Sequence, residues 1–366
     1  MNRLWWEQIK AVIRLELKKT FLARRGLWIY ILALLPVLLF FVYHIAITNQ
    51  DRRRANVARQ GERPLSYQQL LAIHSGMSKP EVLSSLGKPP IHFRWKELRS
   101  GSNQPVTVIW HDEYRYSDGA HDVFLRMTND TVDSVQVHEG RDLAQESATF
   151  AGVFQFFFLR LAVFFGCLGI FMNLFRGEIL DRSLHFYFLA PVRREVLTAG
   201  KFLAGLLATC AIFVTSELLQ NLVFFWNIPS SARDIYLYHN HGLEHALAYI
   251  GVTILGCIGY GAFFLVAGMF FRNPILPAAA ILIWETANPF LPSLLKHFSV
   301  IYYLKALCPV DIPTPPGMPA LLALLISNSE PVSPIVAIFG LLIVALIAVY
   351  LSTLQVRRME INYTTE

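Results

Sequence analysis

The stretch that decides the fold runs from Phe175 to Leu206 and reads FRGEILDRSLHFYFLAPVRREVLTAGKFLAGL. It carries charged residues and a proline, and it stands between two long apolar runs. Charged groups between membrane-spanning helices cannot remain in hydrocarbon, so this segment must lie in water or at the membrane surface. Its basic residues favour the cytoplasmic side, where short loops concentrate lysine and arginine. These residues are Arg176, Arg182, Arg193 and Arg194.

The spacing of charges in this segment predicts a short helix. Glu178, Asp181 and Arg182 lie at helical spacing, and Pro191 ends the helix because it lacks an N–H group and restricts Ala190 before it. Apolar side chains of such a helix can contact the inner leaflet while its charges face a cytosolic partner. The alternative interpretation is an ordinary amphipathic connection that anchors two helices.

The composition assigns the chain to the membrane class. Hydrophobic residues make up 54% of the chain, charged residues only 16%, and the mean hydropathy is +0.42. The net charge of +6 could suggest nucleic-acid binding, but the basic residues adjoin apolar runs, as the positive-inside rule requires. The four cysteines form neither a disulfide framework nor a C-x-x-C metal motif.

The charged segment also carries a family resemblance. The pattern R-G-E-I-L-x-R-S-L-x-x-x-x-L-x-P-V-R-R-x-x-x-x-x-G-K resembles the cytoplasmic segment of type-2 ABC transporter (ABC-2) permeases. In that family the segment includes a coupling helix that docks on a separate ATP-binding-cassette ATPase subunit, and the permeases pair as dimers. The resemblance therefore implies a coupling segment over residues 175–201. Its expected coupling residues are Arg176, Gly177, Glu178, Asp181, Arg182, Tyr187, Pro191, Arg193 and Arg194.

The N-terminal region, residues 1–48, predicts a surface helix followed by a first span. Residues 1–25 mix apolar and basic side chains, which favours a helix along the cytoplasmic leaflet. Residues 26–47 form an apolar run of roughly spanning length with no cleavage site after it. Arg52, Arg53 and Arg54 follow on the outer side, but they open a long loop, and long loops translocate largely regardless of charge.

Residues 49–148 predict a small extracytoplasmic α+β domain with its core at 64–138. Ser78 can cap a helix that ends near Leu86, and Gly87 with the prolines after it stops that helix. Three extended segments follow, and Asn129 with Asp130 marks a hairpin turn between the last two. The segments span residues 106–116, 122–128 and 132–138.

A second resemblance concerns this domain. The run G-M-S-K-P-E-V-L-x-x-L-G-K-P at residues 76–89, with an aromatic strand around Trp110 and Tyr114, resembles the SmpA/OmlA family of outer-membrane assembly lipoproteins. That family binds protein or peptidoglycan-associated partners. The lipobox cysteine of those lipoproteins is absent, so the domain here is expected to be a tethered module or a spacer.

Residues 149–366 predict the remaining five spans, which makes about six in all, each about 20 or more residues long. The fold class is thus a mainly α polytopic bundle with an inserted α+β domain and both termini cytoplasmic. The stretch at residues 320–326 is too short to span and is expected to form a re-entrant or interfacial helix. The five expected spans are residues 152–174, 203–225, 246–271, 275–295 and 335–354.

Polar residues inside the expected spans are candidates for function, because charges within a bilayer are costly unless paired. Arg160 and Glu285 both lie roughly 15 Å deep, at 1.5 Å per residue. Glu217 and Gln220 lie further out on the third span. We expect Arg160 to pair with Glu285 or Glu217, and a purely stabilising ion pair is the alternative to contact with cargo.

Other chemistry is weakly supported. Gly200 and Lys201 lack the remainder of a phosphate-binding loop, so ATP is expected on a partner subunit and no cofactor on this chain. His239, His241 and His245 could bind zinc or copper if their loop curls, but a solvated polar loop is the preferred interpretation.

The sequence therefore predicts the permease subunit of an ABC-2 exporter in a bacterial inner membrane, and not an enzyme. Its expected partners are an ATPase subunit, a second permease copy or paired permease, and membrane lipid, with no nucleic acid. The alternative is a membrane-anchored envelope-assembly or binding protein that works through its extracytoplasmic domain. The cargo leaves no signature in the sequence.

Overall fold

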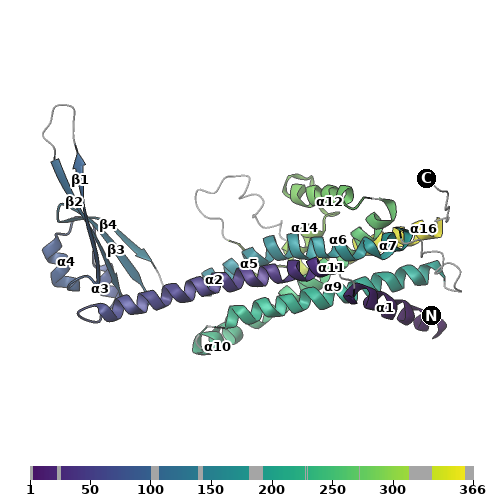
Figure 1. Ribbon diagram of the computed structural model, residues 1–366, viewed down its shortest axis with the longest axis horizontal. Helices are drawn as coiled ribbons and strands as arrows, with labels where there is room; N and C mark the ends of the chain where they lie inside the picture. The colour runs from purple at the N-terminus through teal and green to yellow at the C-terminus, as the bar shows by residue number, and fades with distance from the viewer. Residues whose placement is uncertain are drawn as a thin grey trace. The chain divides into compact units, whose positions relative to one another are not determined.

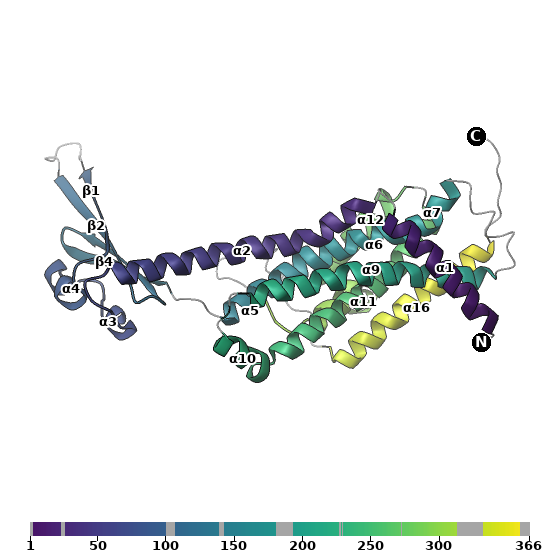
Figure 2. The same cartoon turned by 60° about the horizontal axis from the view of Figure 1, so that its bottom comes forward.

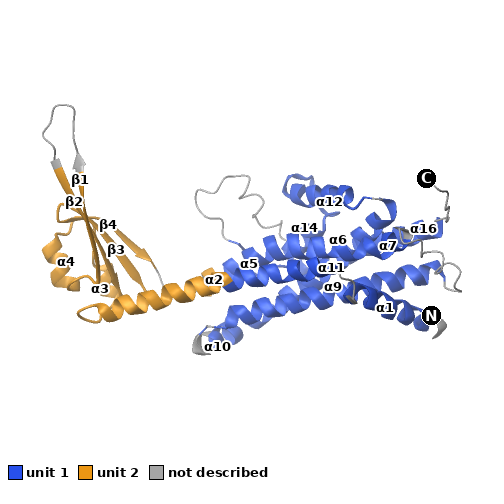
Figure 3. Cartoon of the chain, viewed as in Figure 1, with its two compact units in different colours: residues 1–41, 147–366 blue, residues 42–146 orange. Residues whose placement is uncertain are grey.

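The computed structural model describes residues 3–22, 26–99, 107–138, 143–180, 193–226, 228, 230–271, 273–312 and 332–358. The chain divides into two compact units, coloured separately in Figure 3. Unit 1 comprises residues 1–41 and 147–366, and unit 2 comprises residues 42–146. Unit 1 is helical, and unit 2 contains the sheet.

Unit 1 is a bundle of long helices, labelled in Figure 1. The helical rod formed by Gln145–Glu178, the second long rod of the bundle, is not a regular α-helix throughout, because a π-helical stretch, η2, interrupts it at Phe154–Val163. The elements are α1 (Arg3–Leu22), α2 (Leu27–Gln60), α5 (Leu143–Val153), η2, α6 (Phe164–Phe171), α7 (Asn173–Leu180), α9 (Arg194–Phe225), α10 (Ser230–His239), α11 (Gly242–Phe270), α12 (Ile275–Ala287), η3 (Asn288–Phe290), α13 (Ser293–Lys296), α14 (Val300–Ala306) and α16 (Pro334–Arg358). Residues 42–60 of α2 and residues 143–146 of α5 belong to unit 2.

Five of these rods are long and apolar enough to cross a membrane, which makes this a multi-pass membrane protein. The rods are Leu27–Gln60, Gln145–Glu178, Arg194–Phe225, Gly242–Phe270 and Pro334–Arg358. Many of their leucine, isoleucine and phenylalanine side chains are exposed on the protein surface, as lipid-facing positions require. The sequence prediction of a membrane bundle is confirmed at this level.

The second and third rods run in opposite directions. Phe150, near the start of the second rod, packs edge-on to Phe224, near the end of α9, with ring centroids 5.6 Å apart. At the other end, Phe171 closely approaches Gly205, near the start of α9. Phe150 also packs on Phe40 of α2 at 5.3 Å, so the start of the second rod and the end of α9 meet the middle part of α2 here.

The second rod and α11 run in the same direction. Phe150 lies 5.1 Å from Tyr249, near the start of α11. Near the end of α11, the backbone of Met172 lies so close to Gly268 that a Cβ there would come within 3.0 Å of it. The successive rods from α2 to α11 therefore alternate in direction, as consecutive membrane crossings must.

The last rod, α16, runs parallel to α11. Leu341 lies beside Gly259, and Ala345 shares a buried cluster with Ala262, so both helices advance together. Figure 2 shows α9, α11 and α16 beside one another. Because α11 and α16 point the same way, the chain returns along the bundle between residues 270 and 334.

The fifth expected span does not form a long helix. α12 has 13 residues, or about 20 Å of helix, which is less than the roughly 30 Å of a hydrocarbon core. Pro274 precedes it, and Pro289 lies in the 3-10 turn that follows it. Prolines remove backbone donors and break helices, so the apolar run at residues 275–295 is divided into short pieces. A sixth full-length helix is not found among the described residues.

Unit 2 is an antiparallel four-stranded meander in the order β1-β2-β3-β4. The strands are β1 (Ile91–Arg99), β2 (Thr107–Ser117), β3 (Asp122–Thr128) and β4 (Thr131–His138), and the helices are α3 (Tyr67–Leu71) and α4 (Lys79–Leu86). Asn129 and Asp130 have φ of 49° and 67°, which is the two-residue hairpin turn expected from the sequence. Three strands and their turn are thus confirmed.

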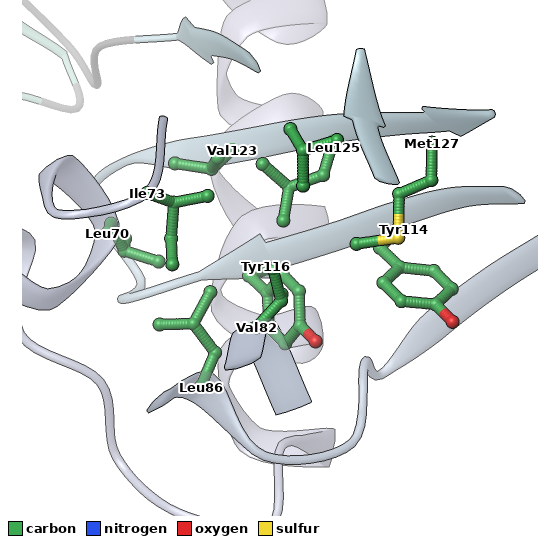
Figure 4. Packing of buried hydrophobic residues seen from close by; sticks show 10 residues of the cluster. Leu70, Ile73, Val82, Leu86, Tyr114, Tyr116, Val123, Leu125 and Met127 are labelled. Atoms are coloured by element: carbon green, nitrogen blue, oxygen red, sulfur yellow. The ribbon is translucent and has the colours of Figure 1, made fainter. Parts of the chain in front are cut away.

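Local chemistry explains the ends of α4. Ser78 and Glu81 form a reciprocal capping box at its start, and Gly87 ends it with φ of +81°. The hydroxyl of Tyr116 donates to the carbonyl oxygen of Gly87 at 2.9 Å. Figure 4 shows Val82 and Leu86 of α4 facing the sheet, where they join the buried core of this unit.

Two further elements of unit 2 were missed in the sequence. β1 is absent from the expected strands, and α3 begins at Ser66 with its own capping box. α2 also continues far beyond the first apolar run, so Arg54 is helical rather than part of a loop. The Arg54 guanidinium is buried, with its Nε 3.3 Å from Asp122 Oδ2. Because Arg54 is buried and paired with an acid, its charge does not indicate the orientation of the chain in the membrane.

One buried acid in unit 2 has a perturbed pKa. Asp112 is 2% exposed and receives Lys79 Nζ at 2.9 Å and His92 Nε2 at 2.7 Å. Burial opposes its ionisation, but the hydrogen bonds from His92 and Lys79, together with the nearby Arg94 charge, outweigh burial and hold the pKa of Asp112 below its usual value.

Candidate functional site

The N-terminal helix α1 packs against α9 with an apolar stripe. Ile9 and Val12 are buried, and Gly200 of α9 approaches Val12 so closely that a Cβ at Gly200 would lie 3.0 Å from its side chain. Trp6 and Leu15 are exposed on the two flanks of this stripe. The surface helix expected from the sequence is therefore present, with one face on the bundle and one free for the interface with lipid.

A buried ion cluster joins α1, α7 and α9. Lys201 is fully buried, and its Nζ lies 2.7 Å from Glu16 Oε1 and 2.8 Å from Glu178 Oε2. The same ammonium donates to the carbonyl oxygen of Leu174 at 2.7 Å. Lys19 Nζ adds a contact of 3.1 Å to Glu178 Oε1. Two carboxylates and two ammonium groups thus balance, which is the condition for keeping charges out of water.

The buried ion cluster joins the helices that flank the central part of the expected coupling segment. Glu178 precedes residues 181–192 in the chain and Lys201 follows them, so this ion pair links α7 to α9 on either side of that stretch of sequence. Beside it, the Arg193 guanidinium lies over the Trp5 ring at 5.1 Å. Arg194 donates to the carbonyl oxygens of Val356 at 3.1 Å and of Arg357 at 2.8 Å. The start of α9 is therefore fastened to both α1 and α16.

The nine expected coupling residues separate into two groups. Arg176, Gly177, Glu178, Arg193 and Arg194 are described. Glu178 is 5% exposed and turned into the protein, so its carboxylate serves the cluster rather than an outside partner. The other four, Asp181, Arg182, Tyr187 and Pro191, lie outside the described residues, as does the expected helix at residues 320–326.

Sequence reasoning did not predict that Glu16 and Lys201 would form this cluster. Each of them, however, is an ionisable residue at a position where an apolar residue is expected. Glu16 falls on the same helical stripe as Ile9 and Val12, where an apolar residue is expected. Lys201 stands near the start of a 32-residue apolar helix. An ionisable residue in each of two apolar surfaces predicts that the two meet, although it does not identify the partners.

The expected pairing of Arg160 is not formed. Arg160, Glu217 and Glu285 are all described, and no ion pair within 4 Å joins Arg160 to either carboxylate. Arg160 lies on η2 with its guanidinium 5.3 Å from the Phe156 ring centroid. It interacts with Glu285 only over a longer distance.

The oxygens of Glu285 are used by α14 instead. The hydroxyl of Ser299 and the N–H groups of Val300 and Ile301 donate to this carboxylate at 2.8, 2.9 and 2.8 Å. Glu285 therefore caps the start of α14 from α12, with its negative charge at the positive end of a helix. This buried cap is a structural reason for a glutamate at this depth.

Glu217 and Gln220 lie on α9 and are completely buried. Glu217 Oε1 accepts from Asn221 Nδ2 at 2.9 Å. Glu217 Oε2 and Gln220 Nε2 have no hydrogen-bond partner within the described part of the chain. Each of these two residues therefore keeps one buried polar atom without a partner there.

The histidine loop is a turn between α10 and α11. His241 adopts the left-handed conformation with φ of 57°, and its Nδ1 lies 3.0 Å from Glu244 Oε2. Across the described ranges, no group of three histidine, cysteine, aspartate or glutamate side chains has the geometry of a metal site.

Comparison of the chain with protein-family models, with curated proteins and with solved structures gives no match.

Proposed function

We propose that this chain is the membrane permease subunit of a type-2 ABC exporter, which moves a substrate across a membrane with energy from ATP hydrolysed on a separate subunit. The resemblance of residues 176–201 to the coupling segment of such permeases supports the proposal. The chain has no phosphate-binding loop of its own, so nucleotide would be bound by an ATP-binding-cassette partner. A second permease copy completes the path.

The observation that carries the proposal is the buried ion pair between Glu178 and Lys201. A partner that pushes on residues 181–192 acts on a stretch whose flanking helices, α7 and α9, are linked by this ion pair. The displacement is then transmitted to the second rod and α9 as a unit instead of being absorbed by a loose loop. Glu16 joins α1 to the same cluster, so the surface helix moves with them.

The direction of α16 supports six crossings. If both termini are cytoplasmic, the parallel orientation of α11 and α16 requires one crossing between residues 270 and 334. We assign it to α12 and α14 in succession. Val300 lies beside Gly259 and Leu304 beside Gly256, so α14 runs antiparallel to α11. A discontinuous crossing of this kind leaves a helix start within the membrane, where Glu285 caps it.

The test is capture of the ATPase. The full chain is purified from its native membrane in mild detergent, and ATP hydrolysis in the preparation is measured. We expect an ATPase to copurify with the wild-type chain and to be lost from Arg182→Glu and Arg193→Glu. Arg233→Glu is the matched control, because Arg233 lies on α10 at the opposite end of the bundle from Arg193.

The orientation is checked separately by labelling. Ser183→Cys in spheroplasts or whole cells is expected to resist a membrane-impermeant maleimide until the membrane is opened. Labelling of this position from outside intact cells would refute the proposal, and so would repeated failure to recover an ATPase with the wild-type chain.

A second candidate function rests on unit 2. The sheet exposes Phe93 at 64% and Trp95 at 41% of their surfaces, and exposed aromatic rings favour partner binding. On this alternative, unit 2 captures an envelope partner and the membrane helices hold it in place. Deletion of residues 64–138 separates the candidates, because transport survives the deletion in the first and partner capture is lost in the second.

A further inference from the structure

Unit 1 contains a small cavity at the end of the bundle where α9 ends and α11 begins. Aromatic rings form most of its wall, contributed by Phe150, Phe224, Tyr236 and Tyr249. The polar side chains of Asn221 and His245 also line the cavity. The cavity is open on one side, and its interior has room for about one water-sized group.

Several buried polar atoms next to this cavity have no partner. Tyr249 is 3% exposed, lines the cavity, and has a hydroxyl without a hydrogen bond in the described ranges. Glu217 does not itself line the cavity and lies behind its wall, one helical turn before Asn221 on α9; the Nδ2 of Asn221, in the wall, donates to Glu217 Oε1 at 2.9 Å. Glu217 Oε2 and Gln220 Nε2 are also unpartnered there. Glu217 is close enough to Tyr249 for the two side chains to interact electrostatically.

This arrangement is costly without a ligand. A fully buried carboxylate needs a cation or several hydrogen-bond donors, and Glu217 has one donor, Asn221. Neither lysine nor arginine lies within 4 Å of it among the described residues. The contrast with Glu285, which receives three donors, shows that the same bundle can satisfy a buried glutamate when it serves a structural role.

We propose that Glu217, Tyr249 and the aromatic wall form a binding site for a protonated amine, entered through the open side of the cavity. The ammonium N–H groups donate to Glu217 Oε2 and to the Tyr249 hydroxyl oxygen, which are the two acceptors without partners. The rings of Phe150 and Phe224 add cation–π attraction and contact the carbon atoms that follow the nitrogen.

The chemistry favours an amine over other cations. A quaternary ammonium ion has no N–H to give to Glu217, and its methyl groups exceed a cavity of about one water molecule. Calcium or magnesium requires about six oxygen ligands, more than Glu217 and Tyr249 supply. A primary ammonium group matches the cavity in size and charge, and two of its three N–H groups serve the two acceptors. The site does not depend on the proposed transport function, because binding is measured on this chain alone.

The test uses the full chain in nanodiscs of phosphatidylglycerol and titrates it with octylammonium chloride, following tyrosine fluorescence. Octyltrimethylammonium and 1-octanol test the need for N–H donors and for charge. We expect Glu217→Gln to weaken octylammonium binding by roughly tenfold or more, as the loss of a charge-assisted hydrogen bond predicts. Tyr249→Phe is expected to weaken it by roughly threefold to tenfold. Glu195→Gln, an exposed carboxylate at the other end of α9, is the matched control and should bind as wild type.

The proposal is overturned if Glu217→Gln binds octylammonium as tightly as wild type, or if octyltrimethylammonium or 1-octanol binds equally well. Glu217→Gln removes a buried charge, so folding should be retained, and Tyr249→Phe gives a second, independent reading. Nanodiscs that contain phosphatidylethanolamine identify the source of the amine. Weaker apparent octylammonium binding in those discs indicates a lipid headgroup, and unchanged binding indicates a free amine. Either result requires the same site.

Discussion

Replacing Lys201 by methionine should be among the most damaging single changes in this chain. Methionine keeps most of the volume but removes the ammonium that lies 2.7 Å from Glu16 and 2.8 Å from Glu178. Two carboxylates, with side chains 5% and 7% exposed, are then left close together beside the half-exposed Lys19. Breaking a buried ion pair by removing one partner typically costs about 3–5 kcal/mol. The melting temperature should fall by on the order of 10 °C.

The assay can use the chain's own thiols. Cys167 and Cys257 are buried and free, so a thiol-reactive dye reports their exposure as the bundle unfolds in detergent. Lys19→Met is the matched control, because Lys19 is 50% exposed and its loss should cost roughly 1 kcal/mol or less. A triple variant that adds Glu16→Gln and Glu178→Gln to Lys201→Met removes the unpaired charges and should recover much of the lost stability.

Two outcomes would refute this reasoning about the cluster. In the first, Lys201→Met melts at the same temperature as Lys19→Met, which means that burial adds nothing to the pair. In the second, the triple variant is no more stable than Lys201→Met, which means that lost packing, rather than unpaired charge, destabilises the single variant.

Three further predictions concern other parts of the chain. Because the folded-state pKa of Asp112 is lowered, its stabilisation of unit 2 is complete above the unfolded pKa of about 3.9 and is lost as the pH falls through that value toward the folded pKa, so hydrogen exchange in β2 should accelerate on acidification in wild type and much less in Asp112→Asn. Gly166→Ala should destabilise the bundle by about 1–3 kcal/mol, since its Cβ would lie 2.1 Å from the Phe213 ring, whereas Gly251→Ala, with open space around it, should be nearly neutral; equal melting temperatures for the two would contradict the packing described. Glu285→Ala removes the cap of α14 and leaves buried N–H groups unpaired, so we expect a loss of about 2–4 kcal/mol in the dye assay, and an unchanged melting temperature would show that the cap is dispensable.

Local signals in the sequence accounted for much of unit 2. The α4 helix followed from Ser78 and Gly87, and the β3–β4 hairpin followed from Asn129 and Asp130, because caps and turns depend on a few adjacent residues. β1 was missed, because its assignment depends on its pairing with β2, from Ile91 opposite Arg115 to Arg99 opposite Thr107, which forms only when the chain folds.

For the charged residues of the membrane region, the sequence indicated which positions are unusual but not which groups they contact. The sequence indicated that Arg160, Glu217 and Glu285 were unusual at their depth, because an apolar run makes any ionisable residue conspicuous. It did not indicate that Glu285 caps α14 instead of pairing with Arg160. An ionisable residue in an apolar run indicates that its burial is costly, but the sequence does not show which neighbouring group offsets that cost.

By itself, the sequence determined that this is a multi-pass helical membrane protein with an inserted α+β unit, because hydrophobic length and turn chemistry are properties of contiguous residues. Only the tertiary structure decided that Glu16 meets Lys201 across 185 positions, that α12 stops short of a full span, and that α16 runs parallel to α11. These outcomes depend on which faces of separate helices pack together. Helix rotation and direction are fixed by packing among distant segments, which hydropathy along one segment does not encode.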